Sequence, residues 1–379
     1  MDTYIQKIRD ESPTLQQKTF LNHASRGPLH GRTKQAVLEY LSRWEEWNFK
    51  ECRNMFDRVR EQFGQLINAK KEEIAFIPDV SHGSKLAASM LKYDKNSNIV
   101  CYWNDYAGQV YQGLYLEKTK GIEYRPVPDR NNAIFAEDFA EKIDQNTVLV
   151  LLSHVQWLTG CKTDLEEICK IAHENDAYVL TDTIQSSGAM FNDVKKWDVD
   201  FLTCGVTKWL LGPRQRGLFF MKEKLIEEFY PPFAGYHGTD SGSDDQPYWN
   251  VKKLEYLPSI KKFCDINTGD FIYWIAREGM QIILEYGMNR VEERIFKLTD
   301  YLIEELEKIP EAKIQSPLER NERSGIINVK VKDNVEIVKK LAEKGIVTSS
   351  RFDGIRISPH FYNAEDDIDV LISNLKELI

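Results

Sequence analysis

The sequence predicts an α/β protein with a large, doubly wound, mostly parallel sheet domain and a smaller α+β domain. Two observations lead to this prediction. Between residues 74 and 221, short segments that are apolar on both faces alternate with amphipathic helical segments, which is typical of a parallel sheet covered by helices on both sides. The chain also has 379 residues, a length that favours two folded units over a single core.

The elements of the large domain follow from the spacing of apolar residues. Residues 32–68 carry apolar side chains at helical spacing, interrupted at 48–54, and predict an N-terminal helical region. A regular alternation of strands and helices is expected after it. Strands are predicted at 74–78, 98–103, 122–128, 147–155, 177–182, 200–205 and 217–221, and helices at about 83–91, 109–118, 136–143 and 164–174.

A polar, glycine-rich stretch at 235–246 ends this alternation. A long helix is predicted from about 271 to 309, with a bend at Gly287. The remaining segments predict strands at 325–331, 345–349 and 354–358, and helices at 335–344 and 364–378. We therefore expect a large domain at 15–265 and a small α+β domain formed by 1–14 and 266–379.

Charge and composition argue against several classes of protein. The net charge is −9 and the basic residues are dispersed among carboxylates, so a nucleic-acid partner is not expected. The sequence has no apolar run of about 18 residues and a charged start, so neither membrane insertion nor secretion is expected. The six cysteines show no CxxC pair and no metal-ligand spacing. A cytoplasmic protein with reduced cysteines and no metal site is the expectation.

Two residues at the ends of predicted strands carry possible chemistry. Asp182 ends an apolar strand, and ligands of open α/β sheets bind at the carboxyl ends of strands. Lys208 follows the next strand and is flanked by Trp209, Leu210 and Leu211, where desolvation favours a neutral, nucleophilic amine. Each residue also has a simpler interpretation: Asp182 as a helix cap, and Lys208 as a surface lysine with a buried stem.

Together these segments resemble a known family. The stretch from SHVQWLTGCKTDLEEI to KWLLGP is similar to the class V aminotransferases, the fold type I pyridoxal 5'-phosphate (PLP) enzymes that include cysteine desulfurases and isopenicillin N epimerase-like proteins. The resemblance extends from LNHASRGPLH at 21–30 to RISPHFYNAEDDID at 356–369. It implies a PLP cofactor and a fold type I architecture.

The resemblance assigns roles to three residues of the central stretch. Lys208 matches the lysine that binds PLP covalently and then moves the α-proton of the substrate. Asp182 matches the aspartate that pairs with the pyridine nitrogen, and Gln185 matches the residue bonded to the 3-oxygen of the ring. Lys208 and Asp182 are therefore the expected catalytic residues.

Further cofactor contacts are implied nearer the N-terminus. Val80, Ser81 and His82 match the segment that holds the cofactor phosphate at a helix N-terminus. Tyr106 matches the residue that stacks on the PLP ring. Two alternatives stay open: His82 as a surface turn residue, and Tyr106 as a core tyrosine.

The resemblance also implies a substrate pocket and a dimer. Arg356 matches the arginine that grips the substrate α-carboxylate, and Asn22 and His23 match the other wall of that pocket. Thr268 matches a threonine that reaches the cofactor phosphate of a second subunit, which implies a homodimer with its active site at the interface. A helix cap is the alternative for Thr268.

The sequence departs from its relatives at three places. No cysteine follows Cys264, so the persulfide chemistry of a desulfurase, which needs a loop cysteine, is disfavoured. Gly205 and Thr207 stand where relatives have a serine-type residue and a histidine, although Thr207 can still donate a hydroxyl to the phosphate. The segment GPRQRG at 212–217 introduces two arginines, Arg214 and Arg216, which either contact an acidic substrate group or are solvated.

The leading hypothesis is a PLP-dependent enzyme that acts on the α-carbon of an amino acid or amine by transamination or β-elimination. An epimerase or racemase remains an alternative, because it begins with removal of the same proton. A PLP-fold protein that binds without catalysis is a further alternative. The joint presence of Lys208, Asp182, Gln185 and Arg356 argues against the last of these.

Overall fold

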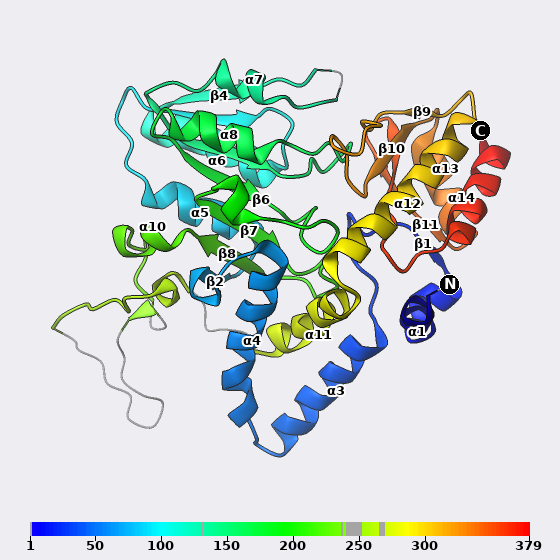
Figure 1. Ribbon diagram of the computed structural model, residues 1–379, viewed down its shortest axis with the longest axis horizontal. Helices are drawn as coiled ribbons and strands as arrows, with labels where there is room; N and C mark the ends of the chain where they lie inside the picture. Colours follow the sequence, from blue (N-terminus) through cyan, green and yellow to red (C-terminus); the bar gives the residue numbers. More distant parts are fainter. Residues whose placement is uncertain (1, 131, 236–237, 240–251, 265–269) are drawn as a thin grey trace.

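The computed structural model describes residues 2–130, 132–235, 238–239, 252–264 and 270–379 (Figure 1). Its centre is a seven-stranded sheet with the order β2-β8-β7-β6-β5-β3-β4. The strands are β2 (Ile74–Ile77), β3 (Asn98–Tyr102), β4 (Glu123–Val127), β5 (Thr147–Ser153), β6 (Tyr178–Asp182), β7 (Phe201–Gly205) and β8 (Gly217–Met221).

The predicted mostly parallel sheet is confirmed. Strands β7, β6, β5, β3 and β4 run parallel to one another, whereas β8 pairs antiparallel with both β7 and β2. The short connection from β7 to β8 contains no helix long enough for a parallel crossover. Strands β2, β3, β7 and β8 are buried along their whole length, which explains why they read as continuous apolar segments.

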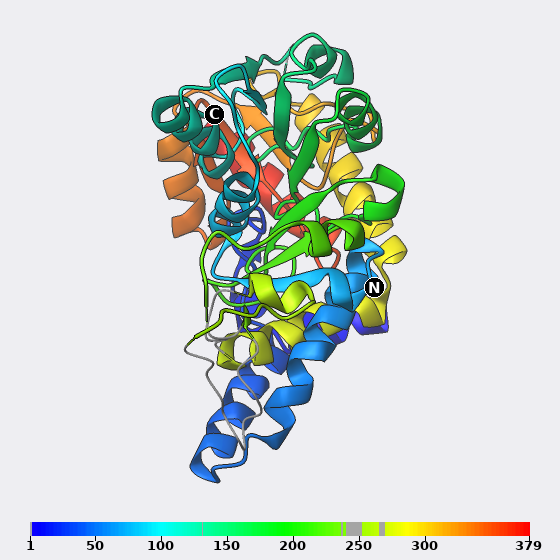
Figure 2. The ribbon, with the colours of Figure 1, turned by 90° about the vertical axis from the view of Figure 1, so that its left-hand side faces the viewer.

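Helices cover both faces of this sheet (Figure 2). Helix α5 (Val80–Met90) packs against α6 (Ala107–Lys120), while α8 (Leu165–His173) packs against α7 (Ala136–Ala140) and α9 (Val194–Trp197). Helix α10 (Glu223–Glu228) follows β8. Helix α5 begins earlier than the predicted start at 83, because the Asp79 carboxylate accepts the His82 N–H and caps the helix at Val80.

A group of long helices connects the sheet to the C-terminal part of the chain. Helix α11 (Asp270–Tyr286) packs against both α3 (Gly31–Glu45) and α4 (Lys50–Ile67). The bend predicted at Gly287 is a full break, after which α12 (Met288–Glu307) begins. Gly287 has a φ of 92°, a conformation that favours glycine. Helices α3 and α4 extend away from the sheet at the bottom of the view (Figure 1).

The C-terminal part forms a smaller α+β unit. Its antiparallel sheet has the order β12-β13-β10-β9, with β9 (Lys313–Ile314), β10 (Ile327–Lys330), β12 (Ser349–Arg351) and β13 (Gly354–Ile357). Strand β1 (Thr19–Phe20) pairs with β11 (Ile346–Val347). The remaining helices are α1 (Thr3–Asp10), α2 (Pro13–Gln17), α13 (Asn334–Glu343) and α14 (Glu365–Leu378).

We keep the division into two domains as a proposal, with boundaries adjusted to the packing. Leu21 belongs to the apolar cluster of the C-terminal unit, although 15–265 was expected to form the large domain. Helix α11 lies in the segment 266–379 that was expected to form the small domain. Its residues Tyr273, Trp274 and Met280 instead belong to the apolar cluster of the large domain. Within the described residues, no helix combines the length and apolar character that crossing a bilayer requires.

Candidate active site

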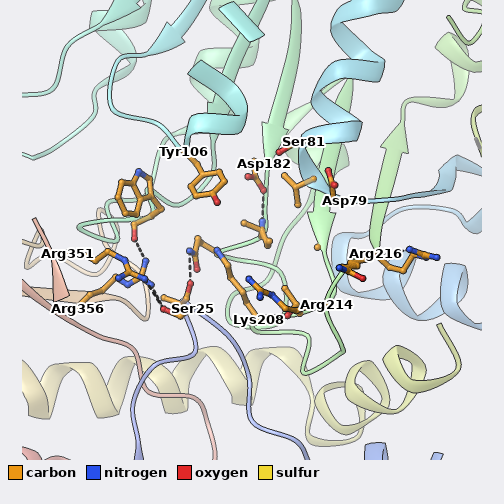
Figure 3. Close-up of a pocket in the computed structure, with 18 residues that line it drawn as sticks. Ser25, Asp79, Ser81, Tyr106, Asp182, Lys208, Arg214, Arg216, Arg351 and Arg356 are labelled. Atoms are coloured by element: carbon orange, nitrogen blue, oxygen red, sulfur yellow. Dashed lines mark hydrogen bonds between the residues drawn. The ribbon is translucent and has the colours of Figure 1, made fainter. Parts of the chain in front are cut away.

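A cavity of about 440 Å³ lies where β6 and β7 end and α5 and α6 begin (Figure 3). This is the edge of the sheet at which open α/β folds bind ligands. The cavity brings together eight residues predicted from the sequence: Val80, Ser81, Tyr106, Asp182, Gln185, Thr207, Lys208 and Arg356. Its volume lies within the roughly 300–1,000 Å³ typical of small-molecule sites.

Lys208 projects into the cavity from the turn that follows β7. The turn packs tightly against its neighbours: a Cβ on Gly188, which has a φ of 93°, would lie 2.6 Å from the Trp209 carbonyl oxygen. Burial lowers the pKa of the Lys208 amine, while the nearby Asp182 carboxylate raises it. More of this lysine is therefore neutral and nucleophilic near neutral pH than of an exposed lysine.

Asp182 is the last residue of β6 and its side chain is buried. Its Oδ1 accepts the Ile184 N–H at 2.8 Å, and its own carbonyl accepts the His154 N–H at 3.0 Å. Burial raises the pKa of this carboxyl, against the opposing effects of the Ile184 N–H and Lys208. A buried carboxylate gains most from a cationic partner, and a protonated pyridine nitrogen is such a partner.

Gln185 also faces the cavity with a fixed orientation. Its Oε1 accepts the Trp209 indole N–H at 3.0 Å, and its Nε2 donates to the Ala24 carbonyl at 3.1 Å. An indole N–H can only donate, so the amide oxygen must face Trp209. The amide nitrogen is consequently the group that Gln185 presents toward Ala24 and the cavity.

One end of the cavity has the character of an anion site. Val80 and Ser81 bring the N-terminal turn of α5, with its free N–H groups, to the wall. Thr207 Oγ1 is buried there without a hydrogen-bond partner in the described part of the chain. Arg214 and Arg216 line the same end. Gly205, where relatives have a serine-type residue, also lines the cavity, and a Cβ there would lie 2.8 Å from Ile184 Cδ1.

His82, predicted to contact the phosphate, is not among the described residues that line the cavity. Its backbone N–H donates to Asp79 Oδ1 at 2.8 Å and completes the cap of α5. A contact of His82 with the phosphate stays a prediction. Thr268 lies outside the described residues.

The other end of the cavity is formed by arginines from the C-terminal sheet. Arg356 on β13 is 2% exposed, and it donates to the Trp157 carbonyl at 2.6 Å and to Ser25 Oγ at 2.7 Å. Arg351 on β12 donates to the same Ser25 Oγ at 3.1 Å. Burial, with a smaller effect of Arg351, lowers the pKa of Arg356 to about 9. This end is therefore suited to a carboxylate.

The structure does not bring Asn22 and His23, predicted to form the other wall of the substrate pocket, to the cavity. Neither is among the described residues that line the cavity, and Ala24 and Ser25 take that place. The His23 ring turns away because its Nδ1 lies 3.0 Å from the Ser358 carbonyl and its Nε2 contacts the Tyr362 hydroxyl. Burial lowers the pKa of His23 well below its ordinary value, so it is a neutral core residue.

Sequence reasoning missed Ser25, Trp157 and Arg351. Ser25 and Trp157 lie inside the family-like segments LNHASRGP and SHVQWLTG. The spacing of residues in these segments does not single them out as site residues. Arg351 had a detectable signal: it precedes the short FDG turn before Arg356, and a tight antiparallel turn brings flanking residues close together.

The residues of the cavity fit PLP. A buried amine, a buried carboxylate and an anion-binding helix terminus face one cavity, and the unpartnered Thr207 Oγ1 is a hydroxyl positioned to bond a phosphate oxygen. Lys208 would hold the aldehyde, Asp182 the ring nitrogen, and Val80, Ser81 and Thr207 the phosphate. The described residues contain no group of three or more His, Cys, Asp or Glu side chains arranged for a metal ion.

Fold and cavity together define a fold type I PLP-dependent enzyme. The chain belongs to the aminotransferase class-V family, whose sequence profile matches residues 46–371. The resemblance inferred from the sequence is thereby confirmed, as are the PLP cofactor and the action on amino acids.

Relatives with different activities align over nearly the whole chain. The uncharacterized aminotransferase YcbU of Bacillus subtilis is 24% identical and covers 97% of this chain and 96% of its own. A kynureninase of Shouchella clausii is 24% identical, and the alignment covers 98% of this chain and 90% of the kynureninase. Among solved structures, a cysteine desulfurase of Thermococcus onnurineus NA1 in its apo form superposes with a TM-score of 0.88 at 21% identity, covering 99% of this chain and 98% of that one.

Proposed function

We propose that the enzyme removes the α-proton of an amino acid with Lys208, and that transamination or β-elimination follows. The observation that carries the proposal is the convergence of Lys208, Asp182 and Arg356 on one cavity. Bound PLP supplies an electron sink for the electron pair that the α-proton leaves behind. Both reactions begin with this proton transfer, so one site serves either outcome.

Each residue has a separate task in this scheme. Arg356 binds the α-carboxylate and thereby orients the α-carbon toward Lys208. The Lys208 amine accepts the α-proton and returns it later in the reaction, which its lowered pKa favours. Asp182 keeps a negative charge beside the ring nitrogen. Tyr106 and Trp157, whose rings meet edge to face at 6.3 Å, reduce the access of water from the solvent side.

The absence of a loop cysteine narrows the range of reactions. The turn between β12 and β13 consists of Phe352 and Asp353, and no cysteine follows Cys264 in the sequence. A desulfurase that passes sulfur to a cysteine of this segment is therefore not proposed. The related lyase and transaminase reactions need no such residue.

Product analysis with a panel of amino acids tests the proposal. Glutamate formed from 2-oxoglutarate and an amino donor indicates a transaminase, whereas pyruvate and sulfide from a cysteine derivative indicate a lyase. Exchange of the α-proton with deuterium from solvent, without either product, indicates the epimerase alternative. If holoenzyme exchanges no α-proton with any amino acid, the proposal fails.

We further propose a homodimer whose interface borders the active site. Large apolar side chains that are 42–64% exposed lie on α3 and α6: Leu38, Leu41, Trp44, Tyr111, Leu114 and Tyr115. Large apolar side chains that stay exposed on one helix mark interaction surfaces. Tyr106 caps α6 and lines the cavity, so a second subunit on α6 approaches the site.

Sedimentation velocity tests the dimer. The double substitution Leu114→Asp and Tyr115→Asp is expected to yield a monomer, and Gln65→Asp on α4 serves as a surface control. A double variant that sediments as the unmodified protein contradicts the dimer.

We also propose a reducing compartment such as the cytoplasm for this protein. Five of the six cysteines, Cys101, Cys161, Cys169, Cys204 and Cys264, are free and buried. Thiol titration of denatured protein tests this: free thiols are expected, and disulfides in protein isolated from its native source contradict it.

A further inference from the structure

The strongest feature that the proposed reaction leaves unexplained is a pair of arginines in the active-site cavity. Arg351 and Arg356, hereafter the arginine pair, flank the turn between β12 and β13 and both line the cavity. Their guanidinium groups meet at Ser25, whose Oγ accepts from Arg351 at 3.1 Å and from Arg356 at 2.7 Å. Figure 3 shows the two side chains together on one side of Lys208, away from Arg214 and Arg216.

The arginine pair has only neutral acceptors in the described part of the chain. These are Ser25 Oγ, the Trp157 carbonyl and the Ser350 carbonyl. Other arginines that are removed from water pair with carboxylates: Arg323, which is 1% exposed, pairs with Asp300, and Arg9 pairs with Asp367. The arginine pair therefore differs from Arg323 and Arg9, because no carboxylate among the described residues balances its charge.

Placing two unneutralised cations side by side opposes folding. Like charges in a partly desolvated site repel each other, and each guanidinium loses hydration. Burial, and to a smaller extent Arg351, lowers the pKa of Arg356. Burial also lowers the pKa of Arg351. Buried Arg356 also has an Nε without a partner among the described residues. Both guanidiniums are thus ready to bind anions.

One carboxylate balances only one of the two positive charges of the pair. A single guanidinium can hold both oxygens of a carboxylate in a bidentate arrangement. Arg356, the more buried, matches the α-carboxylate role, which leaves the charge of Arg351 available. We infer that the substrate is an amino acid whose side chain ends in a second acidic group, and that Arg351 binds this group. The inference rests on the proposed function, because it assigns the α-carboxylate to Arg356.

The surroundings of Arg351 fit a role in specificity. Trp157 contacts Phe352, with ring centres 6.0 Å apart, and also contacts Tyr106. Burial lowers the pKa of Arg351, and a partly desolvated guanidinium attracts an anion more strongly than a fully solvated one. A neutral side chain in the same place would leave this charge unpaired, which disfavours neutral amino acids.

Binding of amino acids to the holoenzyme tests the inference. Aspartate, glutamate, cysteine sulfinate and phosphoserine are compared with alanine, asparagine and glutamine by titration of the visible absorbance of the cofactor. At least one acidic amino acid is expected to bind more tightly than its neutral counterpart. Arg351→Gln is expected to weaken that binding roughly 10- to 150-fold while leaving alanine nearly unchanged.

Two further variants make the result decisive. Arg351→Lys keeps the charge and is expected to retain part of the preference, and Arg130→Gln removes a surface arginine as a matched control. Equal weakening of acidic and neutral amino acids by Arg351→Gln would mean that both arginines hold the α-carboxylate, which overturns the inference. The absence of any preference in the unmodified enzyme overturns it as well.

A second measurement separates this inference from the proposed function. Glutarate and butyrate differ in one carboxylate and carry no amine, so their binding does not depend on an amine exchange with Lys208 at the cofactor. Glutarate is expected to raise the melting temperature of cofactor-free protein more than butyrate does, and Arg351→Gln to abolish the difference. Loss of the proposed function alone would leave this result intact, and equal effects of glutarate and butyrate would contradict the inference.

Discussion

The Lys208 amine lies 5.9 Å from the centre of the Tyr106 ring. Both side chains face the same cavity, so a flat cofactor held by Lys208 can use the tyrosine as a stacking surface. Tyr106 is 49% exposed, which argues against the alternative of a core tyrosine. The contact leads to the first prediction.

Tyr106→Ala is expected to weaken PLP binding roughly 2- to 12-fold, because stacking contributes about 0.5–1.5 kcal/mol. Tyr106→Phe keeps the ring and is expected to bind as the unmodified protein does. Fluorescence titration of cofactor-free protein with PLP measures both affinities. Equal affinity in the alanine and phenylalanine variants would exclude a stacking role.

Asp182→Asn is expected to preserve the fold and reduce turnover by roughly 10²–10⁴-fold. The asparagine oxygen can still accept the Ile184 N–H, but the negative charge beside the ring nitrogen is lost. Turnover and thermal melting are measured on the same preparation. If turnover is unchanged while the melting temperature falls, Asp182 is a structural residue.

The double variant Arg214→Gln and Arg216→Gln is expected to weaken PLP binding roughly 10- to 150-fold by removing charge-assisted contacts to the phosphate. Both arginines line the phosphate end of the cavity. Pyridoxal, which has no phosphate, serves as the matched ligand, and its affinity is expected to stay the same. An equal loss for both ligands would instead indicate a distorted loop.

His360 is expected to make stability depend on acid pH. Burial lowers its pKa from 6.5 to about 4, and Nδ1 accepts the Phe361 N–H while Nε2 contacts the Trp209 carbonyl. Between pH 6.5 and about 4, His360 is protonated in the unfolded chain but neutral in the folded protein. The free energy of unfolding therefore falls as the pH drops below 6.5, by at most about 3 kcal/mol. Above pH 6.5, His360 does not affect it.

The substitution His360→Gln removes this titration. Urea denaturation at pH values from 7.5 to 4.5 is expected to give a shallower loss of stability in the variant than in the unmodified protein. An identical pH profile in the two proteins would show that other groups, such as the buried His23, account for the dependence.

Local patterns predicted much of the fold and part of the site. Strands that are buried on both faces form continuous apolar segments in the sequence. The ends of β6 and β7, at and after which Asp182 and Lys208 lie, could therefore be predicted. The antiparallel direction of β8 was not predicted, because a buried strand has the same composition in either direction.

The substrate end of the cavity depends on contacts across the whole chain. Ser25 meets Arg351 and Arg356 although they are more than 300 residues away in sequence. The orientation of His23 was not predictable for a related reason: its partner Ser358 is equally distant in sequence, and only the folded chain shows that the ring turns toward it. Neither contact leaves a periodic signal.

The central claim is that Lys208 binds PLP for α-proton chemistry. Borohydride reduction of the purified holoenzyme, followed by peptide mass mapping, tests it most directly. We expect a pyridoxyl group on Lys208, and a Lys208→Ala variant that has neither this modification nor exchange of the α-proton of any amino acid. A pyridoxyl group on another lysine, or undiminished proton exchange in Lys208→Ala, would exclude this role for Lys208.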